Sequence, residues 1–243
     1  MCLIVLAWKV LPDTSLLAAA NRDEFYARAA LPAHWWQDRS GVYAGRDLEG
    51  GGTWLGISRS GHFAALTNVR APADYRADAP TRGSLASDFL AGSISATAYA
   101  AQLAAAADPY NGYNLLVADG QDLVWYSNAQ GAADDARNGR PLAAGIYGLS
   151  NAGLDTPWPK VVRTKAQFSS LLCQGASSAA CFDMLGDTSR AATRHLPDTG
   201  VGLARERLLS AVLIESPDYG TRVSTLVRMR DGEPGTLIER LRH

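Results

Sequence analysis

The chain begins with MCLIVLAWKV (residues 1–10) and, after a short turn, continues with SLLAAANRDEF (residues 15–25). The apolar part of each stretch is uninterrupted, which is typical of strands covered on both faces. Two strands joined by a short turn lie antiparallel, so the end of the second returns to the start of the first. We therefore expect a hairpin that brings residues 21–23 next to Cys2.

Composition indicates a soluble protein with a substantial core. Of the 243 residues, 47% are hydrophobic, and we expect residues 1–243 to form one domain. The 23 Lys and Arg residues and the 24 Asp and Glu residues are scattered, so no nucleic-acid partner is predicted. No apolar run approaches the roughly 18 residues of a membrane span, and no basic leader precedes the first apolar run. We expect a cytoplasmic protein.

Blocks of strands alternate with pairs of helices along the rest of the chain. Residues 25–39 look irregular, and residues 53–58 with 62–68 read as a hairpin whose turn contains a glycine. Strand blocks that alternate with helical blocks predict two sheets between two layers of helices. The expected helices are 84–90, 95–107, 160–172 and 177–185, and the later strands are 113–118, 122–127, 144–150, 208–214, 220–230 and 236–241.

Cys2 is the candidate nucleophile. If Met1 is removed, Cys2 carries a thiol and an α-amine whose pKa of about 8 lets it serve as the base for that thiol. Arg22 would lower the thiol pKa or hold a substrate carboxylate, and Asp23 would orient the α-ammonium. The three cysteines are too few and too unevenly spaced for a disulfide framework or a zinc site, so no metal is predicted.

Each of these residues also has a purely structural interpretation. Cys2 is alternatively a small buried hydrophobe, and Arg22 with Asp23 a solvated ion pair. Asn68 and Asn151 each end an apolar run, where an asparagine donates to an oxyanion or simply terminates a strand. Arg222 is either a salt-bridged residue at a strand end or a holder of a substrate carboxylate.

Short motifs along nearly the whole chain resemble those of the NRDE family, also called the Transport and Golgi organisation protein 2 family. The matching segments are Met1-Cys2, NRDE (21–24), AGRD (44–47), GGTWLG (51–56), LTNVR (66–70), YNGYNLL (110–116), YGLSN (147–151), LDTPWPK (154–160) and YGTR (219–222).

That family is distantly similar to N-terminal-nucleophile hydrolases of the penicillin V acylase and bile salt hydrolase kind. The resemblance implies an α+β fold, a four-layer αββα sandwich. It also implies that Cys2 is the nucleophile, with Arg22 and Asp23 beside it. Asn151 would donate to the oxyanion, with the backbone at Asn68 as the second donor, and Arg222 would be the late arginine of the site.

The leading hypothesis is therefore a cysteine hydrolase that cleaves a non-peptide amide bond in a small molecule, without a cofactor. The resemblance also implies haem trafficking and lipid homeostasis, so the alternative is a non-catalytic binding protein for haem or an acyl lipid that uses the same pocket. The chain has no Cys-Pro haem motif, since Leu3, Gln174 and Phe182 follow the three cysteines. The hydrolase hypothesis requires the removal of Met1.

Overall fold

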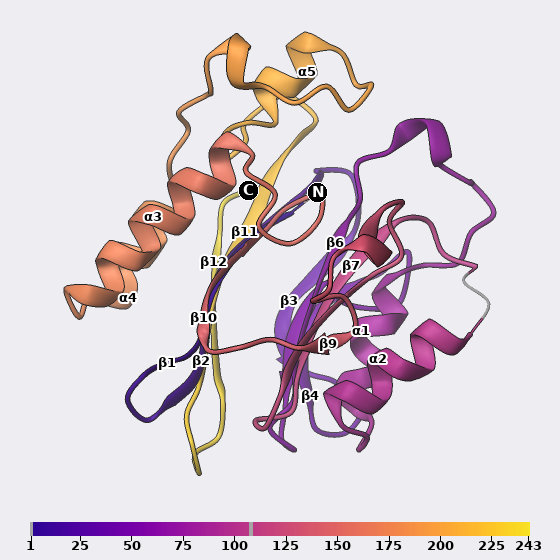
Figure 1. The fold of residues 1–243 in the computed structure, drawn as a ribbon, viewed down its shortest axis with the longest axis vertical. Helices are drawn as coiled ribbons and strands as arrows, with labels where there is room; N and C mark the ends of the chain where they lie inside the picture. Colours follow the sequence, from indigo (N-terminus) through magenta and orange to yellow (C-terminus); the bar gives the residue numbers. More distant parts are fainter. Residues whose placement is uncertain (1, 107–108) are drawn as a thin grey trace.

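The opening hairpin forms as predicted. The structure is a computed structural model that describes residues 2–106 and 109–243 (Figure 1). Strand β1 (Cys2–Leu11) pairs antiparallel with β2 (Thr14–Phe25), which places Cys2 opposite Arg22. The second strand does not end with its apolar run but continues through residues 21–25, because these pair with a neighbouring strand of the same sheet.

Two antiparallel sheets face each other. The five-stranded sheet has the order β10-β1-β2-β11-β12, and the seven-stranded sheet has the sequential order β3 to β9. The strands of the first sheet not yet bounded are β10 (Gly145–Leu149), β11 (Tyr219–Met229) and β12 (Thr236–Leu241). Those of the second are β3 (Ala30–Trp35), β4 (Val42–Asp47), β5 (Leu55–Ser58), β6 (Phe63–Asn68), β7 (Tyr113–Ala118), β8 (Leu123–Ser127) and β9 (Arg140–Pro141).

Helices cover the outer face of each sheet, so the predicted four-layer αββα sandwich is confirmed (Figure 1). Helices α3 (Pro159–Cys173) and α4 (Ser178–Met184) lie on the five-stranded sheet, and α1 (Gly83–Ala91) and α2 (Ala96–Ala105) lie on the other. The remaining helical segments are α5 (Leu203–Leu208), η1 (Pro72–Asp74), η2 (Ala132–Asp134) and η3 (Thr193–His195). Within the described residues, every helix is too short or too polar to cross a membrane.

The first strand explains why the opening run is apolar at every position. Ile4, Leu6 and Trp8 belong to the core between the two sheets, whereas their neighbours Leu3 and Val5 belong to the core beneath α3 and α4. Side chains of a strand alternate between its two faces, so one run supplies both cores. The prediction that this strand is covered on both faces is confirmed for Cys2–Trp8, whereas Lys9 and Val10 are exposed.

Two of the element predictions were wrong. Residues 25–39 are not irregular throughout, because Ala30–Trp35 forms the half-exposed edge strand β3, where a proline is tolerated. Residues 208–214 are not a strand, because α5 ends at Leu208 and the buried chain after it bonds to loops: the Leu213 N–H donates to Asp187 O over 2.9 Å. The predicted end of helix 95–107 lies outside the described residues.

The side chain of Asn21 joins β2 to the chain segments that follow α4 and α5. Its side chain is fully buried, and Nδ2 donates to the carbonyl oxygens of Leu185 and Val212, both over 2.9 Å. Its Oδ1 accepts a hydrogen bond from Ser224 Oγ over 2.6 Å. These three hydrogen bonds therefore join the Asn21 amide to residues that are distant in the sequence.

We expect Asn21→Ala to lower the free energy of unfolding by about 2–3 kcal/mol, because two buried carbonyls and one hydroxyl lose their partner. Urea unfolding followed by far-UV circular dichroism measures this. Gln174→Ala is the control, since it removes an exposed amide that donates to Ser170 Oγ, and it should change stability by less than about 0.5 kcal/mol. Equal urea midpoints for the two variants would contradict the role given to Asn21.

Candidate functional site

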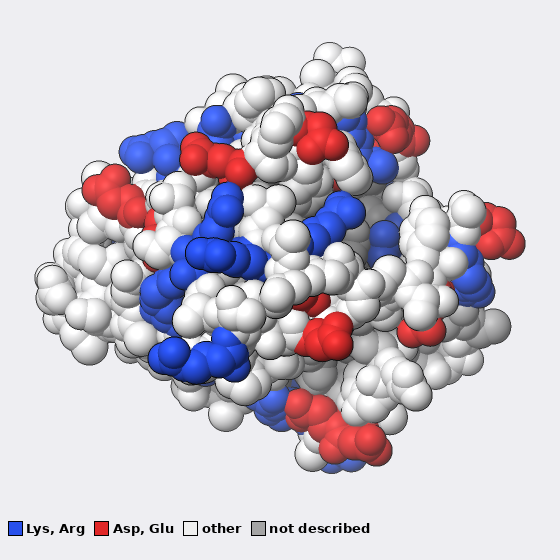
Figure 2. Space-filling view, turned by 90° about the horizontal axis from the view of Figure 1, so that it is seen from above, with Lys and Arg blue, Asp and Glu red and all other residues white. Residues whose placement is uncertain are grey.

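A cleft of about 850 Å³ opens at the end of the sandwich where the two chain ends are marked in Figure 1. On the face seen from above, Lys and Arg side chains lie among Asp and Glu side chains (Figure 2). The cleft is lined by five of the six predicted site residues: Cys2, Arg22, Asp23, Asn68 and Arg222. The sixth, Asn151, is buried, and its side chain donates a hydrogen bond to the Asn68 carbonyl.

Cys2 lies in this cleft with 7% of its surface exposed, opposite Arg22 on the paired strand. Burial raises the pKa of the Cys2 thiol, and the nearby charge of Asp23 acts in the same direction. The charge of Arg22 and a hydrogen bond from the Asp23 backbone N–H favour the thiolate and partly offset that rise in pKa. The thiol is therefore protonated at neutral pH, and it reacts as a nucleophile only where a base removes its proton.

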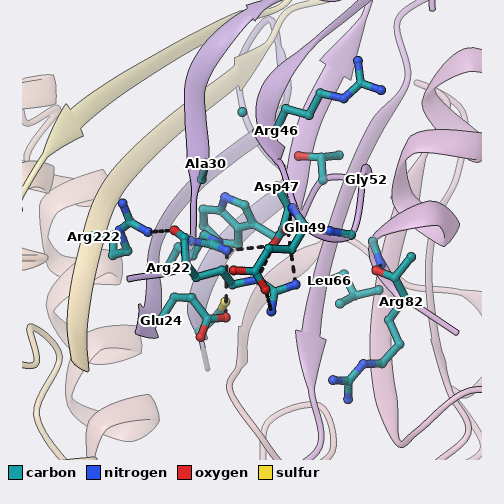
Figure 3. A pocket seen from close by; sticks show the side chains of 18 of the residues that line it. Arg22, Glu24, Ala30, Arg46, Asp47, Glu49, Gly52, Leu66, Arg82 and Arg222 are labelled. Atoms are coloured by element: carbon teal, nitrogen blue, oxygen red, sulfur yellow. Dashed lines mark hydrogen bonds and ion pairs between the residues drawn. The ribbon is translucent and has the colours of Figure 1, made fainter. Parts of the chain in front are cut away.

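Arg22 does not form the solvated ion pair with Asp23 that was one interpretation of the sequence. Its guanidinium lies 3.2 Å from Asp47 Oδ2 and 3.9 Å from Glu24, and Asp47 also accepts a 2.6 Å hydrogen bond from Arg28 (Figure 3). Hydrogen bonds from Arg28 and from the backbone help to hold the pKa of the Asp47 carboxyl below its ordinary value, against the effect of burial. Arg22 is thus held in place beside Cys2 by carboxylates of two strands.

Asp23 is almost completely buried, with 1% of its surface exposed. Its Oδ1 accepts a 2.7 Å hydrogen bond from Thr221 Oγ1, which in turn accepts one from the Ile214 N–H over 2.9 Å. Burial raises the pKa of the Asp23 carboxyl, whereas the charge of Lys160 and the Thr221 hydrogen bond lower it. Lys160 and Thr221 therefore favour the charged form of Asp23, whereas burial disfavours it.

Lys160 is a member of this site that sequence reasoning missed. It occupies the first turn of α3, directly after Pro159, and only 1% of it is exposed. Its Nζ has no hydrogen-bond partner among the described residues. Burial lowers the pKa of Lys160 to about 8, although the charge of Asp23 acts in the opposite direction. A lone lysine in the otherwise uncharged TPWPK stretch was the one signal available in the sequence.

The two predicted asparagines meet where β6 and β10 end beside the start of β1. Asn151 Nδ2 donates to the Asn68 carbonyl over 2.8 Å, and Ser150 Oγ donates to the Cys2 carbonyl over 3.0 Å. The Asn151 carbonyl accepts from the Arg70 N–H over 2.8 Å. Hydrogen bonds between residues 68–70, residues 150–151 and Cys2 thus hold Asn151 close to the Cys2 backbone.

A buried ion pair that sequence reasoning also missed supports this corner. Arg70 lies 2.7 Å from Glu206, with side chains only 5% and 3% exposed, and its guanidinium stacks over the Trp158 ring at 4.6 Å. The two residues come from segments 136 positions apart, so no local pattern relates them. Breaking such a pair leaves a buried charge uncompensated, and we therefore assign it a structural role.

Arg222 lines the opposite side of the cleft from Arg82 in the view of Figure 3. Its Nη1 donates to the backbone carbonyls of Phe25 and Arg28. Among the described residues no carboxylate lies within ion-pairing distance of it, so the salt-bridge interpretation of Arg222 is wrong.

The described part of the chain contains no group of three or more His, Cys, Asp or Glu residues arranged to hold a metal ion. The three cysteines are all free thiols, of which Cys173 is exposed and Cys181 is buried. Burial raises the pKa of Cys181, so this thiol is unreactive near neutral pH.

Comparisons with known proteins identify one family along the whole chain. The family model described as Transport and Golgi organisation 2 matches residues 1–243. The Transport and Golgi organization protein 2 homologs of Bos taurus and Homo sapiens are 36% and 34% identical to the chain. In both cases the match covers 99% of this chain and 92% of the relative.

Two solved structures, of an amidase and of an acylase, are similar to this chain at low sequence identity. One is the Caenorhabditis elegans ortholog of N-acylethanolamine-hydrolyzing acid amidase, with a TM-score of 0.49, 9% identity and coverage of 98% of this chain and 100% of that one. The other is penicillin V acylase from Agrobacterium tumefaciens, with a TM-score of 0.41, 10% identity and coverage of 100% and 86%. On the family model and the full-length relatives, the chain belongs to the Transport and Golgi organisation 2 family.

Proposed function

We propose that this protein is a cysteine hydrolase that cleaves a non-peptide amide bond, with Cys2 as the nucleophile after removal of Met1. The observation that carries the proposal is the placement of Cys2 in a cleft, opposite Arg22 and with a hydrogen bond from the Asp23 N–H to its sulfur. Met1 lies outside the described residues, so its removal is part of the proposal.

The raised pKa of the Cys2 thiol makes a base necessary, and the α-amine of the same residue is the nearest one in a chain that begins at Cys2. The amine takes the thiol proton while the sulfur attacks the substrate carbonyl carbon. The carbon–sulfur bond forms, and the π electrons of the carbonyl move to its oxygen. Asp23 then stabilises the α-ammonium that results, because it is buried next to Cys2.

The resemblance to N-terminal-nucleophile hydrolases assigns the oxyanion to Asn151, which is buried and hydrogen-bonded to Asn68. Its amide has two N–H groups, one of which donates to the Asn68 carbonyl, so the second remains for the substrate oxygen. Collapse of the tetrahedral adduct reforms the carbonyl and breaks the C–N bond, and the leaving nitrogen takes the proton from the α-ammonium. Water then attacks the thioester, gives a proton to the α-amine and releases the acid and the thiolate.

Two forms of the chain test this mechanism. One keeps Met1, and the other is released from a cleavable leader so that it begins at Cys2. We expect Cys2 of the second form to react with iodoacetamide at pH 7.5 at least about tenfold faster than Cys2 of the first, because only the second has a base on the same residue. Exposed Cys173 is the reference thiol on the same chain.

Turnover is the second readout. The form that begins at Cys2 should release p-nitroaniline from one or more members of a panel of N-acyl p-nitroanilides and accumulate one acyl group on Cys2, visible by intact mass. Cys2→Ala should do neither. Equal alkylation rates in the two forms, with no acylation of Cys2, would rule out the hydrolase and leave the cleft as a binding site.

A further inference from the structure

We infer that the ligand of this cleft carries an anionic oxygen group, a carboxylate or a phosphate ester, and that Arg82 binds it. The inference deepens the proposed function, because it takes Cys2 as the reacting residue and names the chemistry of a second part of the same substrate. Arg82 was absent from the residues singled out in the sequence.

Arg82 lines the same cleft as Cys2 and immediately precedes α1. Its Nη1 donates to the Gly112 carbonyl over 3.0 Å, and its own carbonyl accepts from the Leu85 N–H over 3.1 Å. A guanidinium has five N–H donors, so four of those on Arg82 have no protein acceptor among the described residues. Burial lowers the pKa of this guanidinium, although the charges of Tyr75, Glu24 and Cys2 act in the opposite direction.

Most of the other arginines of the cleft are neutralised by the protein itself. Arg22 and Arg28 share the carboxylate of Asp47, and Arg46 binds both oxygens of Asp38 over 2.6 and 2.7 Å. Within the described chain, Arg82 and Arg222 are the cleft arginines that have no carboxylate within ion-pairing distance. They lie on opposite sides of the view in Figure 3, and Arg222 is bonded to two backbone carbonyls.

Among the described residues, no acidic residue of the cleft lies within ion-pairing distance of Arg82, and the charge of Glu24 acts on it only from farther away. Glu24 lies 3.9 Å from Arg22, and Glu49 lies 3.2 Å from Arg28. Glu239 accepts a 2.7 Å hydrogen bond from the Ala33 N–H on the opposite sheet. Each carboxylate therefore already has a partner, whereas Arg82 keeps unused donors in a partly desolvated position.

An anionic oxygen group is the ligand chemistry that satisfies such an arginine. The planar guanidinium donates two parallel hydrogen bonds to a carboxylate or phosphate, and charge-assisted bonds of this kind are the stronger ones in proteins. The interaction strengthens further where water is partly excluded. A substrate anchored at Arg82 would be oriented with respect to Cys2 by a group that takes no part in the bond cleavage.

Matched alkylating reagents test the inference without knowledge of the natural ligand. N-iodoacetylglycine and N-iodoacetylglycinamide present the same reacting carbon to Cys2, and only the first carries a carboxylate. We expect the ratio of their alkylation rates, measured by intact mass and peptide mapping, to be about tenfold higher at Cys2 than at Cys173 of the same chain. Arg82→Gln should bring the ratio at Cys2 to within about twofold of that at Cys173.

Arg46→Gln is the control, because it removes the same charge from the same cleft but from an arginine already paired with Asp38. It should leave the ratio at Cys2 unchanged. An equal loss of the ratio at Cys2 in both variants overturns the inference, as does a ratio at Cys2 equal to that at Cys173 with both this reagent pair and the phosphate pair below. Either outcome can occur while the form beginning at Cys2 still reacts faster than the form that keeps Met1, so this failure is distinct from that of the hydrolase.

A second reagent pair separates the two sources of the anion. The O-phosphate of N-iodoacetylethanolamine and the parent alcohol again share the reacting carbon. A preference for the phosphate that is larger than the preference for N-iodoacetylglycine, and that is lost in Arg82→Gln, identifies a phosphate ester; the reverse order identifies a carboxylate. The absence of an Arg82-dependent preference for either anion overturns the inference.

Discussion

Gly52→Ala is expected to destabilise the protein by about 3 kcal/mol, because a methyl group at this position has no room. A Cβ on Gly52 would lie 2.3 Å from the carbonyl carbon of Gly83 and 2.5 Å from its oxygen. Both atoms belong to the backbone at the start of α1, which cannot yield as a flexible side chain would. Forcing extra atoms into a closely packed region costs about 1–3 kcal/mol and sometimes more.

The matched control is Gly153→Ala, whose new Cβ would meet nothing closer than 3.6 Å. Urea unfolding should show a loss of about 3 kcal/mol for Gly52→Ala and less than about 0.5 kcal/mol for Gly153→Ala. The clash should also displace the start of α1 together with Arg82, and so reduce the reagent preference at Cys2. Unfolding midpoints that agree for the two variants would show that the turn at residues 50–52 adjusts without strain.

The turn around Gly52 shows which parts of the fold a sequence can predict. The glycine cluster predicts a turn, but the close approach to Gly83 is a contact between segments 31 positions apart and has no local signature. The hairpin of β1 and β2 is different, because its pairing follows from two apolar runs and one short turn. The proximity of Cys2 and Arg22 could therefore be predicted from residues 1–25 alone.

The wrong predictions have the same physical origin. Ala30–Trp35 contains a proline and shows no clear alternation. It nevertheless forms an edge strand, because it pairs with β4. The apolar stretch 209–214 has the composition of a strand, but it does not form one and folds as a buried connection. Only its end contacts β11, where the Ile214 N–H donates to Thr221 Oγ1 and the Ile214 carbonyl accepts from the Thr221 N–H. In both cases the tertiary context decided against the local preference.

The residues of the site also fall into those that the sequence predicts and those that it does not. Cys2, Arg22 and Asp23 were found because strand pairing brings them together, and Asn68 and Asn151 because each ends an apolar run. The charged residues that surround these positions come from helices and loops whose docking no single pattern encodes. They are Lys160, Arg70, Glu206 and Arg82.

Of these, Lys160 leads to the second large expectation, a pH dependence of stability. Burial lowers the pKa of Lys160 from 10.5 to about 8 in the folded protein, whereas the unfolded chain keeps the ordinary value. Between pH 8 and pH 10.5 the unfolded state therefore binds more protons at this residue than the folded state does. Stability rises with pH wherever that holds, so the lysine contribution becomes more favourable by up to about 3 kcal/mol over this range.

The measurement is urea unfolding of the unmodified protein and of Lys160→Met from pH 7.5 to pH 10.5. Other groups titrate in this range, including the thiol of Cys2, whose raised pKa acts in the opposite direction. The difference between the two proteins removes their shared contributions and should grow in favour of the unmodified protein as the pH rises. Below pH 8 the charged lysine is costly to bury, but it also compensates the nearly buried Asp23, so the sign of the difference there reports which term is larger.

Lys165→Met is the control on the same helix, because its ammonium is one third exposed and lies 2.6 Å from Asp155. Its stability profile should run parallel to that of the unmodified protein between pH 8 and pH 10.5. A profile of Lys160→Met that is also parallel would mean that the ammonium keeps its ordinary pKa, and hence that Lys160 reaches water in solution. If the slopes differ as expected, Asp23 shares its buried surroundings with a cation whose charge is lost just above neutral pH. The charge balance around Cys2 would then change in the same pH range. The pH dependence of the protein's stability and the pH dependence of the thiol's reactivity would therefore be linked.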